Sequence, residues 1–192
     1  MIDFLNADIP YMLVIPEGLE LPRQAFGDRV EQFAFLYGTW ELQDDQIWIR
    51  PRAVTSGRVA PGVDHIVIKD RTHPDALKAE GPGHILLGEV HTHGRYKNSY
   101  MNIRPSSLDI GSAIMTITDD VPNRPYVFGV GGHYKPPKNL DLNDMILGTG
   151  IEHGTMRYLF YRLVRASSRP GVFNLSYEST ESRYAGLGIM AV

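Results

Sequence analysis

Two histidines separated by a single residue, His91 and His93, close an apolar segment that begins at Ile85. The segment is typical of a central strand, and side chains two positions apart on a strand point to the same face. Both imidazoles can therefore reach one metal ion. Two neutral imidazoles and one carboxylate suit zinc, and three protein ligands leave a fourth position for water, which is the catalytic arrangement. Taken alone, such a pair of histidines is more often incidental.

The expected carboxylate ligand is Asp109, at the end of the sequence Pro-Ser-Ser-Leu-Asp that starts at Pro105. This segment predicts the first turn of a helix. Ser106 is typical of an N-cap, and an acid three residues later is typical of a capping box. Capping alone would explain the pair, yet residues three apart also share a helix face, so capping and metal binding are compatible. The sequence therefore predicts a zinc site formed by His91, His93 and Asp109.

The composition limits the chemistry that the chain can carry. Its 192 residues are within the range of one domain with a single core. The absence of cysteine excludes a disulfide scaffold, a thiol nucleophile and every zinc site that needs sulfur. A net charge of −3 gives no general attraction to nucleic acid or to an anionic membrane. We read no signal peptide and no apolar run of membrane-spanning length, so we expect a cytoplasmic protein.

The spacing of apolar side chains predicts the elements that position these residues. Strands are predicted at residues 11–15, 31–38, 46–50, 65–69, 85–93 and 126–130. Helices are predicted at residues 21–30, between 73 and 83, from 105 onward, and from about 152 to 166, where apolar residues form one stripe. Strands and helices that are mixed without strict alternation predict an α+β domain, with a central mixed sheet flanked by helices in a three-layer α/β/α arrangement.

Three motifs taken together resemble the pattern of the JAMM (Jab1/MPN+, Mov34/MPN/PAD-1) zinc metalloproteases. Glu31 opens an apolar segment that ends at Gly38, His-Thr-His occupies residues 91–93, and Pro-Ser-x-x-Asp ends at Asp109. The order of the motifs and the expected structural context of each match the family over roughly residues 20–130. The chain is similar to stand-alone prokaryotic members, and the resemblance implies the three-layer, cytidine-deaminase-like MPN/JAB fold.

The resemblance also implies a role for each motif residue. His91, His93 and Asp109 would bind zinc. Glu31 would hold the attacking water as general base and then act as acid toward the leaving amine. Ser106 would donate a hydrogen bond to the oxyanion of the tetrahedral intermediate. These roles agree with general chemistry, because zinc lowers the pKa of water to roughly 7 in favourable sites, within reach of a carboxylate base.

The chain departs from the family pattern between His93 and Ser106. Seven residues are usual there, whereas twelve, Gly94 to Pro105, are present here. A loop can lengthen without moving the strand or the helix that it joins, so the ligand set is unaffected. The lengthened loop, residues 94–104, is basic and aromatic, and the sequence is compatible with either a solvated loop or a lid that contacts substrate.

Other ionisable residues compete for these roles. Glu89 shares a strand face with the two ligand histidines and is an alternative base or fourth ligand. The remaining histidines have no ligand-like spacing and are expected to be structural or exposed: His65, His73, His84, His133 and His153. Four arginines are expected on the solvated face of the last helix, with a basic binding stripe as the alternative: Arg157, Arg162, Arg165 and Arg169.

The sequence therefore predicts a zinc metalloprotease that is deubiquitinase-like, hydrolysing a peptide or isopeptide bond at the C-terminus of a ubiquitin-like modifier. The implied partner is that modifier or its conjugates, whose extended tail can pair with a strand beside the site. A catalytically inactive MPN scaffold and a metal hydrolase of a small molecule are the alternatives. A cytidine-deaminase-type site is excluded because it needs cysteine. The modifier, the type of bond and the oligomeric state are left open.

Overall fold

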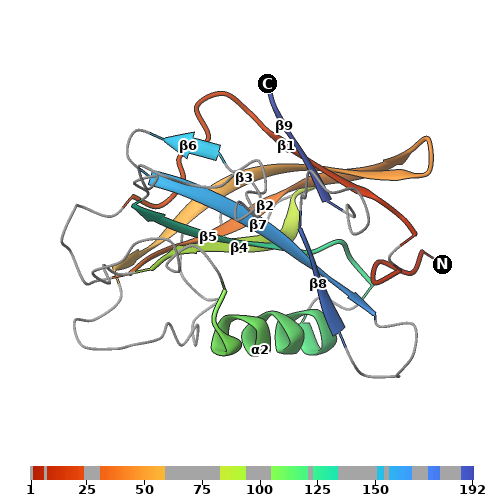
Figure 1. Ribbon diagram of the computed structural model, residues 1–192. Helices are drawn as coiled ribbons and strands as arrows, with labels where there is room; N and C mark the ends of the chain where they lie inside the picture. Colours follow the sequence, from red (N-terminus) through yellow and green to blue (C-terminus); the bar gives the residue numbers. More distant parts are fainter. Residues whose placement is uncertain are drawn as a thin grey trace, which may run out of the picture.

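The computed structural model describes residues 2–6, 8–23, 31–58, 83–93, 105–120, 123–133, 151–153, 156–165, 173–177 and 187–192. The strands within these ranges belong to one nine-stranded sheet (Figure 1). They are β1 (Tyr11–Ile15), β2 (Gln32–Gln43), β3 (Gln46–Arg58), β4 (Ile85–Thr92), β5 (Val127–His133), β6 (Ile151–His153), β7 (Met156–Arg165), β8 (Phe173–Tyr177) and β9 (Leu187–Ala191). Helix α2 (Ser107–Met115) continues into a π-helical turn, η2 (Thr116–Asp120).

The sheet is mixed, with the strand order β6-β7-β5-β4-β2-β3-β1-β9 and with β8 paired to β7. Strand β1 runs parallel to β3 and β9, and β4 runs parallel to β5. The pairs of β2 with β3 and with β4 are antiparallel. Strands β2 and β4 are therefore neighbours near the middle of the sheet; Glu31 immediately precedes β2, and His91 and His93 lie at the end of β4 and just after it.

Each face of the sheet has its own core. One core is built from alternate residues of β1 to β5 and β7, among them Leu13, Leu36 and Phe160. The other includes Phe33, Phe128 and Ala113, so α2 packs on this second face, below the sheet in Figure 1. Both faces of the central strands are consequently removed from water, which is the largest favourable contribution to folding.

The glycine that ends the apolar part of β2 has a steric cause. A Cβ atom at Gly38 would overlap the backbone carbonyl of Arg50 on β3. A Cβ atom at Gly88 on β4 would likewise overlap the backbone carbonyl of Val127 on β5. Any larger residue would push the neighbouring strand away, so close strand pairing explains both glycines.

The predicted three-layer α/β/α fold with helices flanking a central sheet is wrong. Most of the described residues are in strands, and α2 with η2 is the only helical segment among them. The helix beginning at residue 105 is confirmed, whereas the C-terminal helix predicted at about 152–166 is instead β6 and β7. The segment that was expected to form a helical layer on the other side of the sheet therefore belongs to the sheet itself.

The physical reason for this error is that β7 is buried on both faces. Its residues from Met156 to Val164 are all buried. A strand covered on both faces is a nearly continuous apolar run, which periodicity alone does not separate from a buried helix. The arginines within the run made the apolar positions look like a helical stripe.

The arginines of β7 are not on a solvated helix face as predicted. Arg162 is fully buried and lies over the ring of Tyr11, 3.9 Å from the ring centroid. Its two terminal nitrogens donate to the carbonyls of Ile9 and Asn6 at 2.6 and 2.7 Å. Arg157 is also buried, while Arg165 is exposed and pairs with Asp3. Arg162 therefore fastens the N-terminal segment to the sheet.

The other predicted elements have mixed outcomes. Strands are confirmed where they were predicted at 11–15, 31–38, 46–50, 85–93 and 126–130, but β2 continues to Gln43 and β3 to Arg58, five and eight residues beyond the predicted ends. Residues 21–23 are not helical, and 24–30 lie outside the described residues, as do the strand predicted at 65–69 and most of the helix predicted between 73 and 83. In the described part of the chain, no helix has the length and apolarity needed to cross a membrane.

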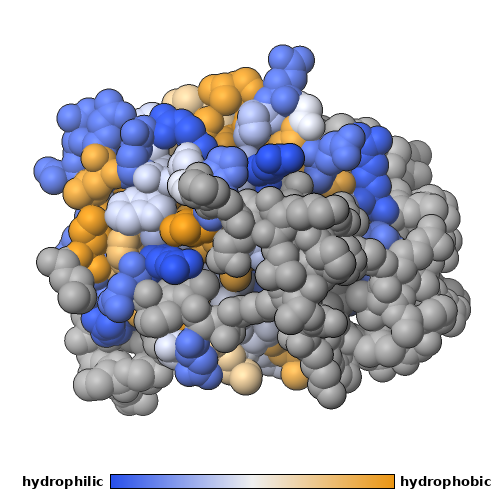
Figure 2. All heavy atoms as spheres, turned by 180° about the vertical axis from the view of Figure 1, so that it is seen from behind, coloured by the Kyte–Doolittle hydropathy of each residue, from blue (hydrophilic) through white to orange (hydrophobic). Residues whose placement is uncertain are grey.

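Apolar side chains also occur on the surface. Figure 2, seen from behind relative to Figure 1, shows hydrophobic residues interspersed with hydrophilic ones on the described part of that face. The large exposed apolar residues are Leu42, Leu108, Met115, Met190 and Val192. Scattered residues of this kind are ordinary for a folded domain.

Candidate metal centre

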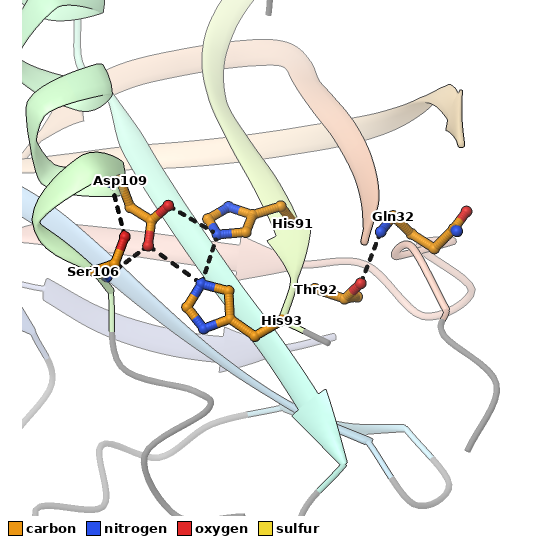
Figure 3. Close-up of polar contacts among 6 residues, drawn as sticks. All are labelled: Gln32, His91, Thr92, His93, Ser106 and Asp109. Carbon is orange, nitrogen blue, oxygen red and sulfur yellow. Dashed lines mark hydrogen bonds and ion pairs between the residues drawn. The ribbon is translucent and has the colours of Figure 1, made fainter. Parts of the chain in front are cut away.

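Strand β4 directs His91 and His93 to one place. His91 is buried near the end of the strand, and His93 follows the last strand residue and is partly exposed. Their Nε2 atoms lie 3.1 Å apart (Figure 3). The backbone N–H of His93 donates to the carbonyl of Gly131 at 2.8 Å, which keeps the chain aligned with β5 beyond the end of β4.

Asp109 reaches the same place from the first turn of α2. The Oγ of Ser106 accepts a hydrogen bond from the backbone N–H of Asp109 at 3.2 Å, and the N–H of Ser106 donates to Asp109 Oδ2 at 2.6 Å. This capping box was predicted from the sequence and is confirmed. It orients the carboxylate, whose Oδ1 lies 3.3 Å from Nε2 of His91 and whose Oδ2 lies 3.2 Å from Nε2 of His93.

The candidate ligand atoms are about as far apart as the ligands of a tetrahedral metal ion. Zinc holds nitrogen and oxygen ligands at about 2.0–2.2 Å, and tetrahedral angles then separate the ligand atoms by roughly 3.3–3.5 Å. Here the two Nε2 atoms lie 3.1 Å apart, Nε2 of His93 lies 3.2 Å from Oδ2 of Asp109, and Nε2 of His91 lies 3.3 Å from the other carboxylate oxygen, Oδ1. One candidate ligand atom from each of His91, His93 and Asp109 lies within 4.8 Å of the others.

The electrostatics of the site favour a cation. Burial acts to lower the pKa of His91, but its hydrogen bond with Asp109 and the charges of Asp109, Glu89 and Glu31 raise that pKa overall. Burial acts to raise the pKa of Asp109, but hydrogen bonds with His91 and His93 hold that pKa well below its usual range. Several carboxylates therefore act on the His91 imidazole, and a cation bound beside it would be attracted in the same way as an imidazolium.

Glu31 immediately precedes β2 and is partly buried. The β2–β4 register pairs Phe33 with His91, so β2 begins beside the end of β4 that carries the histidines. The charge of Glu31 is close enough to raise the pKa of His91. The structure thus brings Glu31, which precedes β2, near His91 at the end of β4.

Glu89, the competing carboxylate, occupies a different environment. It is buried within β4, two residues before His91, and is paired in register with Phe35 on β2 and Phe128 on β5. Both of these phenylalanines belong to the core beneath α2. Glu89 therefore faces the same side as His91 but is enclosed by aromatic residues, whereas Glu31 has access to solvent.

Sequence reasoning missed the contribution of Thr92. This residue is fully buried, and its Oγ1 accepts a hydrogen bond from the backbone N–H of Gln32 at 2.8 Å (Figure 3). Its position between the two histidines was an available signal, because alternation turns its side chain away from the metal site.

The remaining candidates do not join this centre among the described residues. His84 precedes β4, His133 ends β5 and His153 ends β6. The lengthened loop, residues 94–104, lies outside the described residues, as do His65, His73 and Arg169. The group formed by His91, His93 and Asp109 is thus the candidate centre that the described part of the chain supports.

Comparisons with known proteins do not extend this assignment: no protein-family model and no curated protein matches the chain. The argument for function consequently rests on the residues themselves and on their arrangement.

Proposed function

We propose that the chain is a zinc-dependent peptidase or isopeptidase with a JAMM-type centre formed by His91, His93 and Asp109. The observation that carries this proposal is the convergence of one ligand atom from each of these residues beside the carboxylate of Glu31. Zinc bound there would act as a Lewis acid that polarises a carbonyl and acidifies water. The proposed substrate is a ubiquitin-like modifier, cleaved at its C-terminus, and a cytoplasmic location is part of the proposal.

Glu31 serves as the proton carrier in this proposal. Its position at the start of β2 gives it both access to solvent and proximity to the candidate ligands. A carboxylate so placed takes a proton from the attacking water and delivers it to the leaving amine, which is the usual task of a general base that becomes a general acid. The fold supplies this proximity through the pairing of β2 with β4.

Ser106 serves as the oxyanion donor. Its Oγ accepts the capping hydrogen bond from Asp109, and a hydroxyl that accepts through a lone pair can still donate its own proton. The side chain is exposed at the N-terminus of α2, where the helix dipole also favours negative charge. The hydroxyl and the dipole together would stabilise an oxyanion that forms beside the carboxylate of Asp109.

Replacing Ser106 with alanine is expected to reduce kcat by about 100-fold to 1,000-fold, the effect of removing one oxyanion donor. The loss of the cap is expected to lower the free energy of unfolding by about 1 kcal/mol. Zinc content should stay at the wild-type value, because the backbone N–H that holds Asp109 remains. Steady-state kinetics, chemical denaturation and elemental analysis measure the three quantities. Ser107→Ala, at the neighbouring exposed position, is the control, and an equal loss of kcat in both variants would contradict the assignment.

The proposed function is tested by zinc content and by cleavage of modifier fusions. We expect one zinc per purified chain and release of a ubiquitin-like modifier from a C-terminal fusion, with inhibition by a chelator and recovery after zinc is restored. Several modifiers are assayed as linear fusions and as lysine conjugates. Stoichiometric zinc with no cleavage of any of these substrates would contradict the peptidase proposal. Absence of zinc binding would contradict the assignment of the metal site as well.

A further inference from the structure

The threonine between the two ligand histidines joins the two strands of the site. Thr92 is fully buried, and its Oγ1 accepts a hydrogen bond from the backbone N–H of Gln32 at 2.8 Å. Figure 3 shows this contact beside the cluster formed by His91, His93 and Asp109. Gln32 is the residue that follows Glu31, so the contact is one residue away from the proposed base.

The contact extends the pairing of β2 with β4 beyond the regular ladder. The register of these strands ends at the pair formed by Phe33 and His91. At the next position toward the site, the backbone N–H of Gln32 is bonded to a side chain of β4. The Thr92 hydroxyl therefore takes the place of a backbone acceptor at the end of β2 that leads to Glu31.

The backbone of Thr92 is fixed at the same time by the other neighbouring strand. Thr92 pairs with Gly131 of β5, and the N–H of His93 donates to the carbonyl of the same glycine at 2.8 Å. One residue thus holds the ligand-bearing end of β4 through its backbone and the start of β2 through its side chain. Thr92 therefore connects the end of β4 beside His93 with the residue that follows Glu31.

We infer that Thr92 is a positioning residue that holds Glu31 in register with the metal ligands. This inference rests on the proposed function, because it assigns Thr92 an effect on turnover through Glu31. Misplacement of a reacting group by about 1 Å can lower the rate about 100-fold. Loss of a hydrogen bond that fixes the end of a strand can therefore lower kcat. A threonine that only filled space in the core would have no such effect.

Valine and serine at position 92 separate these two roles. Valine has nearly the shape of threonine but no acceptor, whereas serine keeps the hydroxyl and lacks the methyl group. If Thr92 positions Glu31, Thr92→Val should lose activity and Thr92→Ser should retain it. If Thr92 only packs, the order should be reversed, because serine leaves a cavity in a buried position.

The experiment measures kcat, KM, zinc content, thermal midpoint and amide hydrogen exchange at Gln32 in the full chain, with a cleavable modifier fusion as substrate. For Thr92→Val we expect a kcat about 10-fold to 100-fold lower, a KM within about twofold of wild type, full zinc content and faster exchange at Gln32. For Thr92→Ser we expect kcat within about threefold of wild type. Thr39→Val, at an exposed threonine of β2, the strand that contains Gln32, is the control and should behave as wild type.

Wild-type kcat in Thr92→Val, or an equal loss in Thr92→Ser, overturns the inference while leaving the proposed function intact. A wild-type protein that cleaves no fusion overturns the proposed function and this inference with it. If Thr92→Val does not fold, Thr92→Ala replaces it, since it also removes the acceptor but adds no apolar group in place of the hydroxyl. Retention of wild-type kcat in Thr92→Ala then overturns the inference.

Discussion

Asp109→Asn is expected to abolish stoichiometric zinc binding and, with it, turnover. Asparagine keeps an oxygen that can accept the hydrogen bond from the N–H of Ser106, so the start of α2 is preserved while the negative ligand is lost. Loss of a residue that only hydrogen-bonds to a metal ligand typically lowers metal affinity by about 10-fold to 100-fold. Loss of the ligand itself should lower it more. Elemental analysis after dialysis and competition with a zinc chelator measure the effect.

The matched control for this variant is Asp119→Asn, an exposed acid in the π-helical turn that continues α2. It removes the same charge from the same helical segment and should retain full zinc content. Zinc retention in Asp109→Asn at the wild-type affinity would refute the ligand assignment. In wild type, affinity should also decline as the pH falls, because protons compete for His91, and the raised pKa of this residue makes that competition begin at a higher pH than for an ordinary histidine.

The strands near the site were predictable from the sequence because each is a local pattern. The apolar run that ends at Gly38 and the one that ends at His93 are found as β2 and β4. Their adjacency was not predictable, because it depends on pairing between segments more than 40 residues apart. Knowledge of that pairing was needed to place Glu31 beside His91.

The wrong helix shows where pattern reasoning fails. Residues 156–165 contain Arg157 and Arg162, and charged residues in an apolar segment usually mark a solvated face. Burial of Arg162 is instead stabilised by the ring of Tyr11 and by the carbonyls of Ile9 and Asn6. These partners are about 150 residues away in the sequence, so no local window could have revealed them.

The candidate metal cluster was predictable because its residues are fixed by local patterns. His91 and His93 are fixed by the alternation of one strand, and Ser106 and Asp109 by the capping geometry of one helix turn. Only the approach of these two elements is non-local. The link between Thr92 and Gln32 is a non-local contact and leaves no recognisable pattern, so it required the structure.

Glu31→Gln is expected to leave one zinc per chain in place and to lower kcat by about 100-fold to 10,000-fold, the usual contribution of a positioned general base. The amide has the size of the carboxylate but cannot take a proton from water. Zinc content should be unaffected, because the ligand atoms belong to His91, His93 and Asp109. Elemental analysis and single-turnover cleavage of a modifier fusion measure the two expectations independently.

Glu89→Gln is the comparison that makes this result specific. Both carboxylates act on the pKa of His91, so removal of either changes the electrostatics of the site. Glu89, however, is buried between strands β2 and β5, while Glu31 is partly exposed at a strand end. Glu89→Gln should therefore change kcat by less than about tenfold. If Glu89→Gln lost activity while Glu31→Gln retained it, the general base would be Glu89, and the correspondence of Glu31 with the family motif would be accidental.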